Sequence, residues 1–227
     1  MSEYKYLYYK GDEMYYNKRF TEALNYFTKA FSIEKNYDCA NYIGCCHLQL
    51  GDLDKARDMF ENIIRQTAID EIEWARPFIG LAQVCIKKGN YDEALNYLEK
   101  AKAIDSNGAD LYFYYGILYK SQKRYQDAIK ANLQSLEIDE KQHDVYLNLS
   151  DCYYHINEYN KALQCCEKAM ENSDYANDAR YNKGRILIAL RRYAEAKQEF
   201  LKINVSNEKM LKEIQEDIAY CTKHIHD

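Results

Sequence analysis

The chain has 227 residues, and its 31 Lys and Arg against 36 Asp and Glu give a net charge of only −5, with both signs mixed along the sequence. Nucleic-acid binding through phosphates needs a concentrated basic surface, so this composition argues against it. The 8 Gly and single Pro are too few for a strand-rich fold, which needs turn residues, so helices are favoured. Tyrosine is unusually frequent, at 24 residues, and its amphipathic ring suits both half-buried packing and contact surfaces.

The cysteines and the N-terminus bear on the compartment. The eight cysteines are Cys39, Cys45, Cys46, Cys85, Cys152, Cys165, Cys166 and Cys221. Disulfide frameworks are typical of small secreted domains, whereas a chain of this length can build a core without them. No apolar run reaches signal-peptide length at the N-terminus, and no stretch approaches the ~18 apolar residues of a membrane span. We therefore expect reduced thiols, a cytoplasmic location and no membrane association.

The sequence repeats itself six times. An alanine recurs at spacings of 33, 38, 34, 34 and 34 residues, with a bulky residue three positions before it and a small residue twelve positions before it. The alanines are Ala23, Ala56, Ala94, Ala128, Ala162 and Ala196; the bulky residues are Phe20, Leu53, Tyr91, Tyr125, Tyr159 and Tyr193; the small ones are Gly11, Gly44, Ala82, Gly116, Ser150 and Gly184. Antiparallel helices approach closely where facing residues are small, so each unit is predicted to be a helix–turn–helix.

In chain order, the predicted repeats cover about 4–36, 37–70, 75–108, 109–142, 143–176 and 177–207. About four extra residues, around Glu71 to Trp74, separate the second and third repeats and should alter the local stacking, and Pro77 follows early in the next helix, where proline is tolerated.

The turn of each repeat has one position that calls for a left-handed backbone. Gly51 and Gly89 suit it, and Asn157 tolerates it. Lys18, Lys123 and Arg191 occupy the same position, where a left-handed backbone is less favourable for them. A last helix at about 208–225 has one apolar stripe and a charged back, which is typical of the cap of a repeat array. The stripe consists of Leu211, Ile214, Ile218, Cys221 and Ile225.

This pattern resembles the tetratricopeptide repeat, as in the unit DLYFYYGILYKSQKRYQDAIKANLQSLEID. The resemblance implies an all-α, right-handed solenoid in which residues 1–227 form a single superhelical domain of six repeats plus the capping helix. Two departures stand out. Asn132 replaces a packed aromatic, and the proline that usually closes a repeat is missing, so the junctions could be more continuously helical. The residues in the proline's place are Lys35, Ser106, Glu140 and Asp174.

In this family the first helix of each repeat lines a concave groove, which implies a set of peptide-binding residues here. These are Tyr8, Tyr9, Tyr15, Tyr42, Phe113, Tyr114, Asn148, Tyr154, Tyr181 and Asn182. Further inward positions are Asp12, Tyr16, Asn41, Gln49, Arg76, Ile79, Gln83, Lys87, Ile117, Lys120, Asp151, His155 and Arg185. Rigid aromatic anchors suit peptide recognition, and a side-chain amide can read a peptide backbone. The alternatives are that the tyrosines only fill space and that the asparagines are consensus residues; Tyr119 and Tyr153 fall on packing positions.

Other sites are not indicated. The Lys and Asn pattern with which some family members clamp a chaperone carboxylate is absent, since Tyr8 and Asp12 occupy its first places. Phosphate loops, nucleophile elbows and paired-carboxylate motifs are also missing. Cys221, His224 and His226 could bind a metal in principle, but helical spacing puts the two histidines on different faces. We expect no catalytic residue, metal or cofactor.

The resulting prediction is a scaffold or adaptor, not an enzyme, that binds an extended peptide or a partner helix in a Tyr-rich groove. The alternatives are a regulatory or chaperone-like module that sequesters a folded partner, a self-associating structural module, and an accessory domain of a longer enzyme. A closing helix argues against the last of these.

Overall fold

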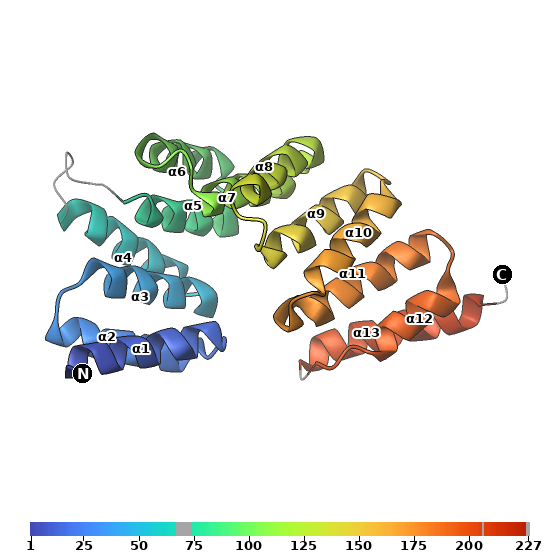
Figure 1. The fold of residues 1–227 in the computed structure, drawn as a ribbon, viewed down its shortest axis with the longest axis horizontal. Helices are drawn as coiled ribbons and strands as arrows, with labels where there is room; N and C mark the ends of the chain where they lie inside the picture. The colour runs from blue at the N-terminus through green and yellow to red at the C-terminus, as the bar shows by residue number, and fades with distance from the viewer. Residues whose placement is uncertain (67–73, 206, 226–227) are drawn as a thin grey trace. The chain divides into compact units, whose positions relative to one another are not determined.

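The computed structural model describes residues 1–66, 74–205 and 207–225, and this part contains thirteen α-helices and no β-strand (Figure 1). In chain order the helices are α1 (Glu3–Tyr16), α2 (Phe20–Ile33), α3 (Tyr37–Leu50), α4 (Leu53–Gln66), α5 (Arg76–Lys88), α6 (Tyr91–Ile104), α7 (Ala109–Ser121), α8 (Tyr125–Ile138), α9 (His143–His155), α10 (Tyr159–Ala169), α11 (Ala176–Ala189), α12 (Tyr193–Leu201) and α13 (Glu208–His224). A short 3₁₀ turn, Ser173–Tyr175, precedes α11. The predicted all-α repeat solenoid is confirmed as the fold class.

The chain divides into two compact units, Met1–Tyr114 and Tyr115–Asp227, called here the first and the second unit. In the first unit, α1 packs against α2, α3 against α4, and α5 against α6. In the second, α9 packs against α10, α11 against α12, and α13 against α12. The repeated sequence pattern therefore appears as successive helix pairs inside each unit.

Each pair has the turn that the sequence predicts. The bulky residue of every repeat is the first residue of the second helix, from Phe20 in α2 to Tyr193 in α12. Gly51 and Gly89 have φ of 85° and 78°, and the other four turns place a residue with a side chain in the same left-handed region. These are Lys18, Lys123, Asn157 and Arg191, with φ between 58° and 62°. A left-handed backbone costs a residue with a side chain about 1–2 kcal/mol of free energy. The packing of the flanking helices must offset this cost at the four turns.

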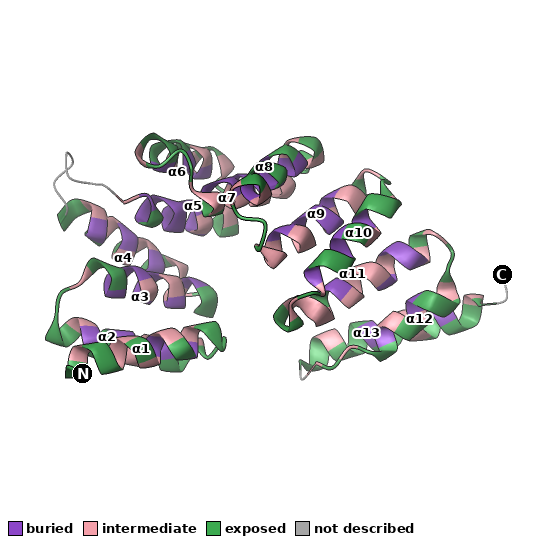
Figure 2. Ribbon diagram, viewed as in Figure 1, coloured by how far each residue is buried: buried purple, intermediate pink, exposed green. Residues whose placement is uncertain are grey.

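Small residues and rings fill the space between paired helices. All six repeat alanines are fully buried. Buried positions recur along the helices of both units (Figure 2). A Cβ added to Gly11 would lie 2.9 Å from the Phe27 ring, and one added to Gly184 would lie 2.5 Å from Phe200. The small position of the first helix thus makes room for the ring that lies one turn after the alanine, which explains why both recur together.

The expectation of more continuous helices is wrong at three junctions, because the residues after α2, α6 and α8 have extended backbones. At the fourth, the 3₁₀ turn Ser173–Tyr175 leads directly into α11. After α2, Asn36 caps α3 by accepting hydrogen bonds from the amides of Asp38 and Cys39, so this helix begins without proline. Pro77 is the second residue of α5, where it is tolerated. The extra residues from Glu71 onward lie mostly outside the described residues.

The last helix packs through a narrower stripe than predicted. Ile214 and Cys221 are buried with Leu187 and Phe200 in one core cluster. Leu211, at the start of the predicted stripe, is 44% exposed. All eight cysteines are free thiols, and seven of them are buried. The cysteines therefore act as small apolar core residues.

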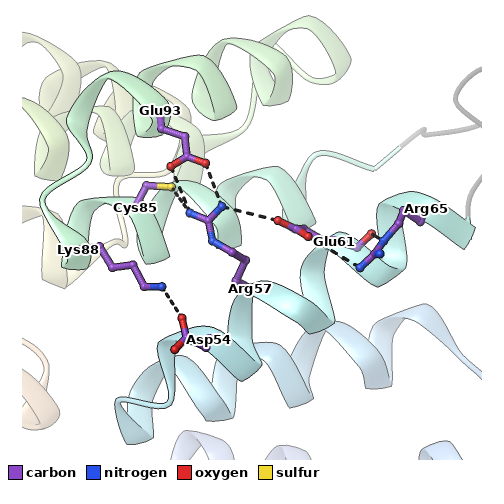
Figure 3. Close-up of polar contacts among 7 residues, drawn as sticks. All are labelled: Asp54, Arg57, Glu61, Arg65, Cys85, Lys88 and Glu93. Atoms are coloured by element: carbon purple, nitrogen blue, oxygen red, sulfur yellow. Dashed lines mark hydrogen bonds and ion pairs between the residues drawn. The ribbon is translucent and has the colours of Figure 1, made fainter.

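An ion-pair network joins α4 to the next helix pair in the first unit (Figure 3). Arg57 donates from Nη1 and Nη2 to the two carboxylate oxygens of Glu93 at 2.9 and 3.2 Å, and its Nη2 also lies 3.2 Å from the Cys85 sulfur. Lys88 Nζ bonds Asp54 at 2.5 Å. These contacts connect α4 directly to α5 and α6.

Candidate peptide-binding face

A hollow of about 240 Å³ lies on the face of the first unit formed by the first helix of each pair. Its walls come from the C-terminal end of α1, the length of α3, the N-terminal half of α5 and the start of α7. The lining residues are Tyr15, Tyr16, Asn41, Tyr42, Cys45, Leu48, Gln49, Arg76, Ile79, Gly80, Gln83, Asp110 and Tyr114. Four tyrosines and several amides make this hollow both aromatic and polar, and it is large enough for one long side chain.

Three of the predicted binding residues converge on this hollow: Tyr15, Tyr42 and Tyr114. Several further positions predicted to face inward also line it, among them Asn41 and Arg76. The sequence reasoning did not single out four lining residues, which are Cys45, Leu48, Gly80 and Asp110. The repeat spacing could have found Asp110, because it lies 34 residues after Arg76 and occupies the same place in its repeat.

In the first unit, aromatic side chains of α1, α2 and α3 form one connected cluster. The Tyr42 ring stacks on Phe27 at 4.7 Å, and it meets the edges of Tyr8 at 6.0 Å and Tyr15 at 5.4 Å. Tyr15 also contacts Phe20 at 5.5 Å. Tyr8, Tyr15 and Tyr42 are half-buried, and ring contacts on several sides restrict their side chains.

The remaining predicted aromatics of the first unit differ in exposure. Tyr9 is 59% exposed, and its ring centroid lies 6.0 Å from that of Tyr8. Phe113 is half-buried beside Tyr114, with ring centroids 5.2 Å apart. Neither Tyr9 nor Phe113 lines the hollow.

Burial sets the protonation of the groups around the hollow. It raises the pKa of the Tyr8 hydroxyl to about 12 and, together with the nearby Asp12 carboxylate, that of Tyr42 well above its usual range. Burial likewise raises the pKa of the Cys45 thiol to about 12. At neutral pH the phenols are neutral hydrogen-bonding groups, and Cys45 is a thiol rather than a nucleophilic thiolate. The arrangement suits binding rather than covalent chemistry.

The corresponding face of the second unit is dominated by charge. Asp151 of α9 lies 3.4 Å from Lys120 Nζ, 3.7 Å from His155 Nε2 and 3.9 Å from an Arg185 nitrogen. The Arg185 guanidinium lies over the Tyr154 ring, 5.0 Å from its centroid. Tyr154, a predicted binding residue, is thus covered by a cation.

The other predicted residues of the second unit make contacts inside the fold. Asn148 is 5% exposed and donates from Nδ2 to Asn132 Oδ1 at 3.1 Å, and Asn182 donates to the Ser150 hydroxyl at 3.0 Å. Tyr181 packs its ring against Phe200, 5.9 Å away. One N–H group of each amide is therefore already engaged with a neighbouring repeat.

The Asn132–Asn148 pair also explains the aromatic position that departs from the family pattern. Asn132 is fully buried, and its Nδ2 donates to the Ala128 carbonyl at 2.7 Å. A Cβ on Gly116 would lie 2.5 Å from this amide, in the space that a ring takes in other repeats. Tyr119 and Tyr153, which fall on packing positions, are only half-buried, and each has a cation over its ring.

Comparison with known proteins identifies the family. Residues 13–179 match the tetratricopeptide repeat protein 21 C-terminal ARM domain, and residues 178–203 match the tetratricopeptide repeat itself. The chain belongs to the tetratricopeptide repeat family. This fold generally mediates protein–protein interactions.

The chain is similar to TPR repeat-containing protein MJ1428 of Methanocaldococcus jannaschii, with 27% identity over 167 residues, covering 64% of this chain and 30% of the relative. It spans less than half the length of the curated relatives it matches. Two solved structures share its fold. One is TTC0263, a thermophilic TPR protein of Thermus thermophilus, with a TM-score of 0.73, 18% identity and coverage of 82% of this chain and 99% of that one. The other is the Cut9–Hcn1 hetero-tetramer of the APC/C, with a TM-score of 0.78, 15% identity and coverage of 96% and 46%.

Two further features are absent from the part of the chain that the structure describes. None of its helices combines the length and the apolar character needed to cross a bilayer. No group of three or more His, Cys, Asp or Glu side chains in this part of the chain is arranged to hold a metal ion. His226, of the three C-terminal residues considered for a metal, lies outside the described residues.

Proposed function

We propose that this tetratricopeptide repeat chain is a cytoplasmic adaptor, without catalytic activity, that binds an extended segment of a partner protein along the inner face of its first unit. Residues 1–227 would act as one domain with the six repeats assigned from the sequence. We expect the ligand to make its strongest contacts in the hollow between α1, α3, α5 and α7.

The observation that carries this proposal is the convergence of Tyr15, Tyr42 and Tyr114 on one hollow of about 240 Å³. Aromatic side chains supply large contact areas at low conformational-entropy cost, so they are frequent hot spots of binding interfaces. Three half-buried rings from three repeats form a preorganised surface. An extended segment crossing these helices could place one side chain in the hollow and continue past Tyr8 and Tyr9.

We expect the second unit to contribute less to ligand affinity than the first. Its inner face offers Tyr154, Tyr181 and the charged groups around Asp151. Because Asn148 and Asn182 already donate to protein acceptors, we propose that they orient the repeats rather than hold the ligand backbone through their donors.

The test is a selection of random twelve-residue peptides displayed on phage against the whole chain, followed by affinity measurements with the enriched peptides. Tyr114→Ala should weaken binding by about 30-fold, equivalent to ~2 kcal/mol for a hot-spot aromatic. Its thermal midpoint should change little, because Tyr114 lies at a hollow rather than in the buried core.

Tyr6→Ala is the matched control, since it removes an exposed tyrosine of the same unit that is not a predicted binding residue and does not line the hollow. It should leave affinity within about twofold of the original protein. Enriched peptides whose affinity ignores Tyr114→Ala, or a selection that enriches none, would contradict binding in this face and favour sequestration of a folded partner or self-association.

A further inference from the structure

The hollow in the first unit contains a buried polar atom without a partner. Asn41 is 8% exposed, and its Oδ1 has no hydrogen-bond donor among the described residues. Its Nδ2 has a weak contact at 3.8 Å with the Cys45 sulfur. A buried acceptor that lacks a donor costs about 1–3 kcal/mol, so folding alone gives no reason to keep an amide here. A ligand that brings N–H groups into the hollow gives such a reason.

Charge at the hollow favours a cationic ligand. Its lining contains one cation, Arg76, and one carboxylate, Asp110. Arg76 lies 3.9 Å from the Asp38 carboxylate and 5.6 Å from the Trp74 ring centroid, so part of its charge is offset at the rim. Asp12 adds a further carboxylate beside Tyr42. Three carboxylates and one cation therefore lie in the hollow or beside the residues that line it.

The walls favour the same kind of ligand. The faces of tyrosine rings attract Lys and Arg cations, and the effect is larger where water is excluded. Arginine also carries five N–H donors on a planar group, and the lining supplies acceptors in Asn41, Gln49 and Gln83 as well as the phenol oxygens. The volume of about 240 Å³ accommodates one such long side chain.

We propose that the hollow between α1, α3, α5 and α7 binds a basic side chain, most suitably arginine, of the partner segment. This inference rests on the proposed function and adds the chemical class of the anchor. The guanidinium lies among the Tyr15, Tyr42 and Tyr114 rings, near the Asp110 carboxylate, and its N–H groups provide the donor that Asn41 lacks.

The experiment uses the phage-selected peptides and the whole chain. We expect Arg or Lys at one fixed position of the enriched sequences. A synthetic peptide is then made in two versions, with arginine or its neutral isostere citrulline at that position. Fluorescence anisotropy should show the arginine peptide binding about tenfold more tightly, since hydrogen bonds and pairing with a charged group are stronger. Asp110→Asn should reduce this preference, while Asp92→Asn, at an exposed position of α6 that does not line the hollow, should leave it unchanged.

Asn41→Leu separates a binding role from a structural one. Replacing an unpartnered amide by an apolar group of similar shape should raise the thermal midpoint and weaken the arginine peptide by about tenfold. The inference is overturned if citrulline binds as well as arginine, or if the enriched peptides have no basic position. In that case a loss of binding in Tyr114→Ala would still support the proposed function, whereas binding that ignores Tyr114→Ala overturns both.

Discussion

The inner faces of the two units are built from the same repeat yet differ in chemistry. In the first unit, Tyr8, Tyr15 and Tyr42 form a ring cluster with Phe27 and leave a hollow beside it. In the second, α9 carries Asn148, which bonds to Asn132 of α8, and an aspartate surrounded by cations. The helix pairs depend on small and bulky residues between helices, so the inner face is left to vary. The difference shows that a shared scaffold separates stability from recognition.

The position one turn after the repeat alanine tests this comparison most strongly. Phe60 is fully buried, and Cβ atoms added to Gly44 and Gly80 would each lie within 2.6 Å of its ring. Phe60→Ala should destabilise the first unit by about 3–5 kcal/mol because it opens a cavity between two helix pairs. Urea unfolding followed by fluorescence of Trp74, the only tryptophan and a neighbour of the same core cluster, measures the loss. A shift below about 1 kcal/mol would mean that the ring does not hold the helices together.

In the second unit, the repeat alanine itself gives the next largest effect. Ala128 is fully buried in α8, so Ala128→Leu should push α8 away from its neighbours and cost about 1–3 kcal/mol through overpacking. Circular-dichroism melting provides the measurement, and Lys130→Leu on the exposed side of α8 is the control. An unchanged midpoint in Ala128→Leu would show that the repeat assignment is displaced.

The Arg57–Glu93 pair should make the first unit sensitive to acid. The Arg57 guanidinium holds the pKa of the Glu93 carboxyl below its usual value. A carboxylate whose pKa is lowered by folding stabilises the protein at pH values above its unfolded pKa of about 4.3. This stability is lost as the pH falls through the pKa of the folded state. The side chain of Glu93 is 37% exposed, so solvent limits the contribution to under about 1 kcal/mol.

Glu93→Gln should therefore lower stability at pH 7 and flatten its dependence on pH below about 5. Trp74 fluorescence unfolding at several pH values detects this change. Glu195→Gln is the control, because the Glu195 side chain is more exposed, at 58%, and pairs only within its own helix region. An equal flattening in both variants would show that the α4–α6 connection has no special role.

The smallest expected effect distinguishes the turns of the two units. Two of the three turns in the first unit have glycine at the left-handed position, whereas those of the second have Lys123, Asn157 and Arg191. Lys123→Gly should stabilise the protein by about 0.5–1 kcal/mol, since relief of strain exceeds the added flexibility of the unfolded chain. Gly89→Lys should destabilise the protein by a similar amount. A Cβ added there meets no atom within 4 Å, so the main cost is the strained backbone. Thermal melting of both variants compares them.

The helix pairs, their order and their turns can be predicted from the amino-acid sequence. The recurrence of Ala23 and its equivalents with a small and a bulky residue follows from close helix packing, and that packing is local to each repeat. For the same reason the first residue of each second helix and the left-handed turn positions could be read from the pattern. The inward placement of Tyr15, Tyr42 and Tyr114 followed from the family resemblance and the same repeat spacing.

Which inward residues meet one another depends on how the repeats pack together. Asn41 and Asn148 look alike as inward amides, yet one lines a hollow and the other bonds to Asn132 of the preceding repeat. Likewise, the asparagine at position 132 is explained by its hydrogen bonds to Ala128 and Asn148. Such contacts join side chains from different repeats, and their geometry depends on how far neighbouring helices are shifted and on which rings fill the space between them. A periodic sequence pattern fixes the direction of a side chain but not the side chain that it meets, because that depends on packing across repeats.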